Sequence, residues 1–313
     1  MQSNLNLVSS AIVNSALESA PESAPDVARD VARHRPDLLA DALSAAIAGR
    51  GQWEGAGGLI VHAMKTSGMH AAGPSLIGCA GWSIARPLAD TFAGDGSHLA
   101  RYAAVLPAVE INSSFYRPHR PQTYARWADS VPPGFRFSVK LPKRITHELG
   151  LIDFAEPLAS FVEEVGALQD RLGCILVQLP PGLAFDAAVA AEFLSALRQR
   201  FGCMLACEAR HASWFAPPAT DLLMRHAITR VIADPAPGQP GPHVPTGAGV
   251  YLRLHGSPRR YYSAYDADML LQLAQALQCW RMAGRSAWCI FDNTAGGAAL
   301  PDALNLLQQT PRP

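Results

Sequence analysis

The chain has 313 residues, of which 49% are hydrophobic and 17% charged, and its formal net charge at pH 7 is zero. This length allows one large domain or two small ones, and the balanced charge excludes the overall basicity of proteins that bind nucleic acids or anionic membranes nonspecifically. The sequence contains no run of 18 or more apolar residues, so we expect no transmembrane helix.

The N-terminal segment predicts an extension outside the folded domain. Residues 1–74 are rich in Ala, Ser, Gly and Asp and contain no strand-like apolar runs. Residues 25–50 have the spacing of an amphipathic helix, and two Gly-rich stretches follow it. Two interpretations stay open: a weakly ordered tail, or a segment upstream of a true start at Met64 or Met69.

The N-terminal residues and the cysteines indicate the cellular compartment. The first residues lack the basic segment and the sustained apolar core of a secretory signal. The six cysteines show neither CxxC spacing nor a paired pattern, and most lie in apolar runs. We therefore expect a cytoplasmic protein with reduced, structural cysteines.

From residue 75 to residue 313, short apolar runs alternate with helical patterns. Segments 187–199 and 268–280 carry apolar residues at i, i+3 and i+4. Alternating strands and helices indicate parallel βαβ units, and eight of them in this length predict a closed (β/α)8 TIM-type barrel. An open doubly wound sheet is the alternative, but the first run is not followed by GxGxxG. The eight predicted strands are 76–80, 108–112, 136–141, 174–179, 204–209, 229–233, 250–255 and 288–292.

Polar residues recur at the carboxyl ends of these strands. Alternate residues of a barrel strand point inward, and the last inward residue reaches the catalytic face. Charged groups are costly to bury without partners, so their recurrence on seven strands predicts a shared polar pocket. A satisfied ion-pair network without chemistry is the alternative. The strand-end residues are Glu110, Asn112, Lys140, Gln178, Glu208, Arg210, Asp234, Arg253, His255, Asp292 and Asn293.

The loops after the last two predicted strands suggest an anionic substrate. Arg259 and Arg260 follow the seventh strand, and Gly296 and Gly297 precede a helix predicted to start near Pro301. Such loops often bind phosphate through backbone amides, although a Gly-Gly pair alone also fits an ordinary turn. Aromatic residues near the strand ends suit a sugar or a flat heterocycle, with lid packing as the alternative; they are Trp82, Phe115, Tyr116, Trp214, Tyr261 and Tyr262.

Several motifs, in order, resemble the DUF72 (YecE-like) family. They are GCAGW, EINSSFYRP, FRFSVKLPKRITH, ILVQLPP, EARHASWF and YLRLHG, between residue 77 and the C-terminus. The resemblance implies a TIM-type barrel whose activity is not established, and a relation to sugar isomerases rests on fold analogy alone. The chain departs from the family pattern at Ala209, where Phe is usual, and at Asp292, where Asn is usual. The second change predicts a more acidic pocket.

Our first functional hypothesis is an enzyme that acts on a small polar, sugar-like or phosphorylated molecule by isomerase- or hydrolase-like chemistry. Glu110 or Glu208, with a pKa raised by burial, would be the general base, and His255 or His147 the acid. Lys140 and Arg253 would stabilise an oxyanion, and Arg210 would hold an anion bidentately. Lys140 is also a candidate Schiff-base nucleophile, but a Lys140–Glu110 ion pair is favoured.

The remaining predicted residues would contact the substrate. They are Trp82, Asn112, Tyr116, His147, Gln178, Arg210, His211, Trp214, Asp234, Arg253, Tyr262, Asp292 and Asn293.

Cofactors and other partners are constrained by the same residues. A divalent metal on Glu110, Glu208, Asp234 and His255 is disfavoured, because three cations crowd the same mouth, so no cofactor is predicted. We expect a small polar or anionic ligand and neither nucleic acid nor membrane as partner, since no basic stripe is present. A second hypothesis is a non-catalytic barrel that binds a metabolite or a protein. The sequence does not predict an oligomeric state.

Overall fold

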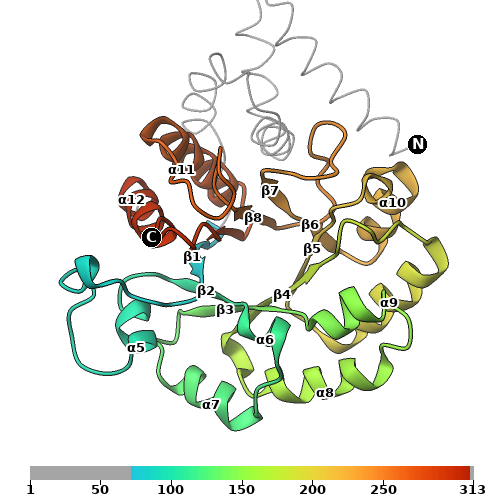
Figure 1. The fold of residues 1–313 in the computed structure, drawn as a ribbon, viewed down its shortest axis with the longest axis horizontal. Coiled ribbons are helices and arrows are strands. Elements are labelled where there is room, and N and C mark those ends of the chain that lie inside the picture. The colour runs from blue at the N-terminus through green and yellow to red at the C-terminus, as the bar shows by residue number, and fades with distance from the viewer. Residues whose placement is uncertain (1–71, 311–313) are drawn as a thin grey trace, which may run out of the picture.

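The computed structural model describes residues 72–310, which form a barrel of parallel strands surrounded by helices (Figure 1). The strands are β1 Ser75–Ala80, β2 Ala108–Ile111, β3 Arg136–Lys140, β4 Leu172–Gln178, β5 Met204–Glu208, β6 Ile228–Arg230, β7 Ile232–Asp234, β8 Val250–Leu254 and β9 Ala287–Phe291. The extension and helix predicted before residue 72 lie outside the described residues.

The sheet closes through a single divided strand. Its order is β6-β5-β4-β3-β2-β1-β9-β8-β7, and every pairing is parallel. The two ends of this order, β6 and β7, are separated in the chain by Val231 alone. They are therefore two halves of one barrel strand, the first paired with β5 and the second with β8. The predicted (β/α)8 barrel with its eight strands is confirmed.

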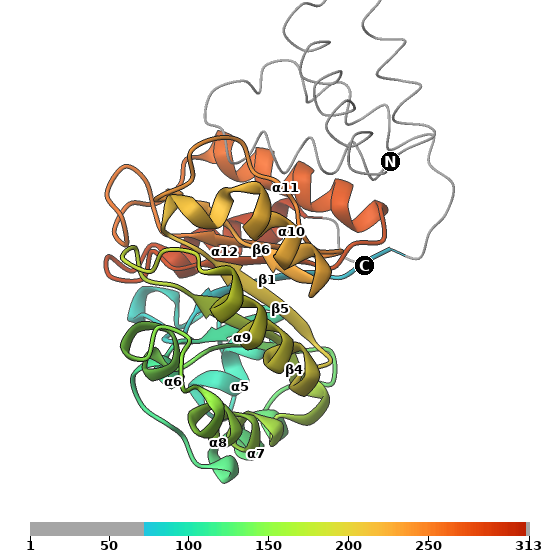
Figure 2. The same ribbon diagram turned by 90° about the vertical axis from the view of Figure 1, so that its right-hand side faces the viewer.

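Helices lie outside the barrel and connect successive strands, except that β6, β7 and β8 follow one another without a helix between them (Figures 1 and 2). Side-chain caps fix several starts: Ser97, Asp186 and Asp266 accept hydrogen bonds from first-turn amides. The helices are α5 His98–Ala103, α6 Ser113–Tyr116, α7 Pro121–Asp129, α8 Ala155–Gly166, α9 Ala187–Arg200, α10 Pro217–Arg225, α11 Ala267–Met282 and α12 Ala299–Gln309. Short turns of helix are η1 Arg86–Leu88, η2 Arg144–Glu148, η3 Gln169–Arg171 and η4 Ala212–Phe215.

The strands separate two cores. The larger core fills the layer between the strands and the helices. The smaller fills the barrel interior, where Trp288 stacks on Tyr251 with ring centroids 5.8 Å apart. Small residues on other strands make room for these rings; a Cβ on Gly173 would lie 2.6 Å from the Trp288 ring. The interior residues are Leu76, Ala108, Cys174, Leu176, Ala206, Val231, Ala233, Tyr251, Trp288 and Ile290.

The six cysteines are free thiols within the described residues, as the sequence predicts. Burial raises the pKa of Cys79, Cys207 and Cys279 to about 12, which makes these thiols unreactive. Within residues 72–310, no helix is both long and apolar enough to cross a membrane.

Candidate functional site

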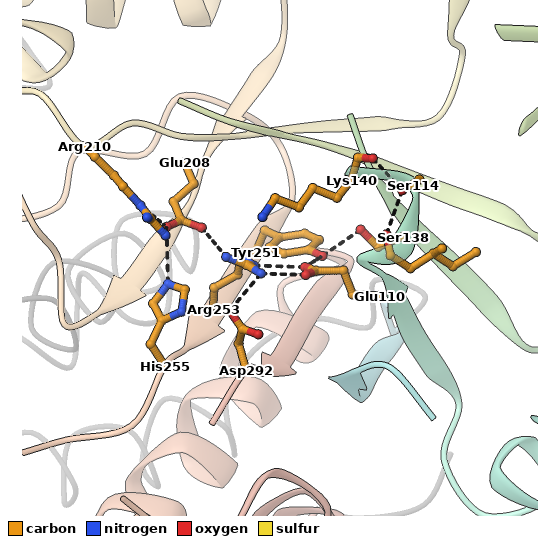
Figure 3. A network of polar contacts seen from close by, with 11 residues as sticks. Glu110, Ser114, Ser138, Lys140, Glu208, Arg210, Tyr251, Arg253, His255 and Asp292 are labelled. Carbon is orange, nitrogen blue, oxygen red and sulfur yellow. Dashed lines mark hydrogen bonds and ion pairs between the residues drawn. The ribbon is translucent and has the colours of Figure 1, made fainter. Parts of the chain in front are cut away.

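Above the apolar interior, the same inward-facing positions turn polar. Glu110 follows Ala108, Glu208 follows Ala206, and Arg253 follows Tyr251, each two residues further along its strand. Because side chains alternate along a strand, these residues continue the column that lines the interior. They lie near the carboxyl ends of parallel strands and therefore meet at one mouth of the barrel (Figure 3).

Arg253 is the centre of this mouth and is fully buried. Its Nε and Nη2 donate to the two carboxylate oxygens of Glu110 at 3.0 and 2.6 Å. Nη1 donates to Glu208 at 2.6 Å, and Nη2 also donates to Asp292 at 3.0 Å. One guanidinium thus joins carboxylates from β2, from β5 and from the residue after β9 (Figure 3).

His255 and Arg210 extend the network on the Glu208 side. The Nε2 atom of His255 lies 3.2 Å from Glu208, and its Nδ1 atom lies 3.0 Å from Asp292. Both contacts are hydrogen bonds only when both ring nitrogens carry protons. Arg210 donates from Nε and Nη2 to Oε1 of Glu208 at 3.0 and 2.8 Å. Glu208 therefore contacts three basic side chains, Arg253, Arg210 and His255.

These contacts set the protonation of the carboxylates. Burial alone would raise the pKa of Glu208, but the charges of Arg253, His255 and Arg210 hold it well below its ordinary value. Asp292 behaves alike: burial opposes ionisation, yet Arg253 and His255 lower its pKa. The negative groups in turn raise the pKa of Arg253 although burial opposes this. The raised pKa expected of a general base does not hold for Glu208.

Lys140, the last residue of β3, is the exception in this network. Its side chain is buried, with 7% exposure, and its Nζ lies 4.0 Å from the centre of the Phe115 ring. Among residues 72–310 its ammonium group makes no ion pair, so the expected Lys140–Glu110 pair does not form. Arg253 and Tyr251 occupy the Glu110 oxygens instead. Burial and the nearby Arg253 lower the pKa of Lys140 to about 8, although the charges of Glu110, Glu208 and Asp292 oppose this shift.

His147 lies beside Lys140. Its ring packs edge-on against Phe115, with centroids 5.0 Å apart, so Phe115 contacts both basic side chains. Partial burial lowers the pKa of His147, and the charges of Lys140 and Arg210 lower it further. The Thr146 hydroxyl lies 2.8 Å from Nδ1 of His147 and donates to the Pro142 carbonyl at 3.5 Å. Among the described residues, Nε2 of His147 has no hydrogen-bond partner.

Two further predicted residues border the mouth on its β2 and β4 sides. Asn112 follows Glu110 by two residues, and its buried side-chain oxygen has no hydrogen-bond partner among the described residues. Gln178 ends β4, is 6% exposed and pairs in register with Glu208. A buried acceptor without a hydrogen-bond partner is costly, so this oxygen is a polar atom that the described residues leave unsatisfied.

The predicted aromatic residues divide between surface and core. Tyr116 is 71% exposed and Tyr262 is 46% exposed, with the Arg259 guanidinium 3.9 Å from the Tyr262 ring centre. Trp82 is half-buried and packs edge-on against Trp127 of α7. Trp214 is fully buried, and its indole nitrogen donates to the Leu183 carbonyl. Its placement is that of a core residue.

Three polar residues of the predicted set make contacts away from Arg253. Asp234 accepts from the Tyr265 hydroxyl at 2.9 Å, and Asn293 donates to Asp302 of α12 at 2.7 Å. Their chain neighbours Ala233 and Asp292 face inward, so alternation turns both side chains outward. His211 lies 2.8 Å from the Ser213 hydroxyl and accepts from the Ser213 amide.

The structure adds residues that the predicted set lacks. The Tyr251 hydroxyl donates to Glu110 at 2.9 Å and lies 2.7 Å from the Ser138 hydroxyl. Ser114 of α6 donates to the Lys140 carbonyl at 2.7 Å and holds the end of β3 (Figure 3). Alternation could have identified Tyr251 and Ser138, because they precede Arg253 and Lys140 by two residues.

The predicted phosphate loop has a different partner. Helix α12 begins at Ala299, close to the predicted start, and the buried Asp302 lies in its first turn. Asp302 accepts hydrogen bonds from Asn293 and from the Tyr265 amide. An acidic side chain already lies at this helix N-terminus, which weakens the case for phosphate there. Within residues 72–310 no three His, Cys, Asp or Glu side chains are arranged to hold a metal ion.

Comparison with known proteins gives a family match over the barrel. The family model described as "Protein of unknown function DUF72" matches residues 76–312. The UPF0759 protein YecE of Escherichia coli K12 is 28% identical over 145 residues, which are 44% of this chain and 53% of YecE. This match thus spans about half of the relative. The UPF0759 protein YunF of Bacillus subtilis is 23% identical over 264 residues, or 74% of this chain and 93% of YunF.

Solved structures of the same description share the fold. A DUF72 family protein from Thermotoga maritima superposes with a TM-score of 0.62 at 26% identity, covering 75% of this chain and 98% of that one. Another from Enterococcus faecalis superposes with a TM-score of 0.63 at 23% identity, covering 75% and 95%.

Proposed function

The chain belongs to the DUF72 family of proteins of unknown function, and from that premise we propose that its barrel mouth is an active site. The site would bind a small polar, anionic molecule of the sugar-like or phosphorylated class and move a proton on it, as isomerases and hydrolases do. Barrels of this kind place their active sites at the carboxyl ends of the strands, where this polar network lies.

A single observation carries the proposal: Lys140 is a buried cation without a carboxylate partner among the described residues. Arg253 and Arg210 are both bound to carboxylates. A buried charge needs a partner, and a bound anion would supply it. With a pKa of about 8, the same amine exchanges a proton near neutral pH.

The other groups would hold the reacting molecule in place. Glu208 stays ionised and fixes Arg210 and His255, so its role is positioning and not proton abstraction. His147 would exchange protons on the Phe115 side of the mouth, and Asn112 would accept a hydroxyl hydrogen bond. Glu110 is fully buried and its oxygens are bound by Arg253 and Tyr251, so its role would be to hold these two side chains.

A thermal-shift screen of small carboxylates, sugars and sugar phosphates tests the proposal. We expect at least one anionic compound to raise the melting temperature of the wild type and of Lys143→Arg, but not of Lys140→Met. Lys143 is the matched control because it is half-exposed and pairs with Glu148 at 3.0 Å. An equal shift in Lys140→Met, or no shift with any anion, would contradict the proposal.

A second candidate function is a barrel that binds a metabolite without catalysis. The low pKa values of Glu208 and Asp292 favour it, because both carboxylates are bound to basic groups and are poor bases. In that case the same ligand binds with no turnover at any pH. An enzyme with Lys140 as its proton-exchanging group would instead show a rate that changes around pH 8.

A further inference from the structure

The geometry of the mouth points to covalent chemistry at Lys140. Resting on the proposed function, we propose that the Lys140 amine forms an imine with a small aldehyde or ketone that carries an anionic group.

The position of the Lys140 amine supports imine formation. Lys140 points inward from the end of β3, and its Nζ lies among carboxylates that belong to Arg253 (Figure 3). Buried charges are usually held by an ion pair, but among residues 72–310 Lys140 has none. Phe115 contacts the amine through its ring face and accepts no proton from it. Among the described residues, no ion pair has to be broken before the amine can react.

The protonation state of the Lys140 amine also supports imine formation. Only the neutral amine attacks a carbonyl, and an ordinary lysine with a pKa of 10.5 is almost fully charged at pH 7. Burial and Arg253 bring the pKa of Lys140 to about 8. The neutral fraction at pH 7 is then roughly 300-fold larger than for an ordinary lysine.

Arg210 would recognise the anionic group of the substrate. Arg210 uses Nε and Nη2 on Glu208, which leaves Nη1 for a ligand, and its side chain is 12% exposed. Phe115 contacts both Lys140 and His147, and the charges of Lys140 and Arg210 lower the pKa of His147. A negative group beside the reacting carbonyl would be bound by Arg210 while the carbonyl carbon faces Lys140.

The reaction balances without an added oxidant or reductant. The lone pair of the neutral Nζ forms a C–N bond to the carbonyl carbon, the C–O π electrons move to oxygen, and one proton passes from nitrogen to that oxygen, which gives a carbinolamine. The carbinolamine then loses water as a second proton reaches the oxygen, and a protonated C=N bond remains. His147 is placed to carry these protons through Nε2. The protonated imine keeps one positive charge at the position of the ammonium group.

Reductive trapping tests this directly, because the chain has only three lysines, Lys65, Lys140 and Lys143. Full-length protein is incubated with glyoxylate and sodium cyanoborohydride, which delivers hydride to the imine carbon and leaves a stable secondary amine. Peptide mass spectrometry measures the adduct at each lysine and at the N-terminus. At pH 7 we expect labelling of Lys140 at least about tenfold faster than of Lys143, with a half-maximal rate near pH 8.

Glycolaldehyde is the matched neutral probe, since it replaces the carboxylate by a hydroxymethyl group. We expect it to label Lys140 at least about fivefold more slowly than glyoxylate, and Arg210→Gln to remove this difference. Lys143→Arg should leave labelling of Lys140 unchanged. Equal labelling of Lys140 and Lys143, or a half-maximal rate above pH 10, would overturn the imine.

The trapping result is distinguishable from a failure of the proposed function. If anions still stabilise the wild type but not Lys140→Met, and no Lys140 adduct forms, the imine is wrong and the binding site stands. If Lys140 is labelled but glyoxylate reacts no faster than glycolaldehyde and no anion stabilises the protein, the anionic substrate class is wrong. Preferential, anion-dependent labelling of Lys140 supports both.

Discussion

At the scale of single residues, the mouth is governed by which cation holds which carboxylate. Arg253 binds two oxygens of Glu110 and one of Glu208, because its planar guanidinium presents several donors in fixed directions. The compact ammonium of Lys140 has no such fork and is left without an ion pair among the described residues. The charge of the fully buried Arg253 is thus balanced by carboxylates, whereas the neighbouring Lys140 has no ion pair among the described residues.

Lys140 should therefore reduce stability at neutral pH. Its pKa is about 8 in the folded chain and 10.5 in the unfolded chain, so the unfolded chain binds more protons between these values. Stability gained from this group rises with pH through that window and is lowest below about pH 8. We expect Lys140→Met to raise the free energy of unfolding at pH 7 by up to about 3 kcal/mol, an advantage that fades by pH 10.5.

Urea unfolding of wild type, Lys140→Met and Lys143→Met between pH 6 and 10.5 measures this effect. The half-exposed Lys143 pairs with Glu148 at the surface, so its variant should stay within about 0.5 kcal/mol of wild type. A Lys140→Met protein less stable than wild type at pH 7 would show that the amine has a stabilising partner.

Glu208→Gln should have the opposite effect. The substitution leaves Arg253, Arg210 and His255 facing a neutral amide inside the barrel mouth. Breaking one side of a buried ion pair costs about 3–5 kcal/mol, measured by the same urea titration at pH 7. Glu148→Gln, at the exposed pair with Lys143, is the control and should change stability by less than about 1 kcal/mol. Equal effects of the two variants would mean that the buried network contributes no more than a surface pair.

At the scale of elements, buried side chains of the helices form hydrogen bonds that join neighbouring strands and connecting segments. Tyr102 of α5 is fully buried, and its hydroxyl accepts from the Cys79 amide at 2.9 Å and donates to the Ala108 carbonyl at 3.0 Å. It thus bridges β1 and β2 where they pair in register. Asp302 similarly joins α12 to the segments after β8 and β9.

Tyr102→Phe isolates the bridging hydroxyl. Removing it leaves a buried amide and a buried carbonyl without partners, so we expect a loss of about 3 kcal/mol in the free energy of unfolding. Tyr116→Phe is the matched control, since Tyr116 is 71% exposed. Thermal or urea unfolding compares the two variants. A Tyr102→Phe protein as stable as Tyr116→Phe would mean that water or a shifted backbone replaces the hydroxyl.

At the scale of the molecule, residues 72–310 form a barrel of parallel strands surrounded by helices. Its strands pair in a continuous order from β6 to β7, and Val231 joins the two ends of that order. Backbone hydrogen bonds begin near the start of this range: the Gly73 amide donates to the Arg281 carbonyl, and the Ala287 amide donates to the Pro74 carbonyl. The packed interior and the layer of helices both lie within these residues.

A chain that starts at Met64 should therefore keep the fold. We expect a single unfolding transition with a melting temperature within about 5 °C of the full chain, measured by circular dichroism. Glyoxylate labelling of Lys140 in the shortened chain checks the mouth independently. Loss of the cooperative transition would show that the first 63 residues stabilise the barrel.

The sequence alone determined the eight strands, their parallel order and the family resemblance. Alternation along each strand is a local property of the backbone, so it also predicted that Glu110, Glu208, Arg253 and His255 face one mouth. The same rule shows why Asp234 and Asn293 differ, because two adjacent residues cannot both point inward. The direction of a strand side chain therefore depends only on residues close to it in the sequence.

Only the tertiary structure decided how the charges pair across the barrel. The sequence favoured a Lys140–Glu110 pair and a raised pKa for Glu208, and neither holds. Pairing depends on distances between side chains from different strands, which the stagger and closure of the barrel fix to fractions of an ångström. Coulomb energies and burial vary steeply over such distances, so the free amine of Lys140 follows from the fold and not from its position in the chain.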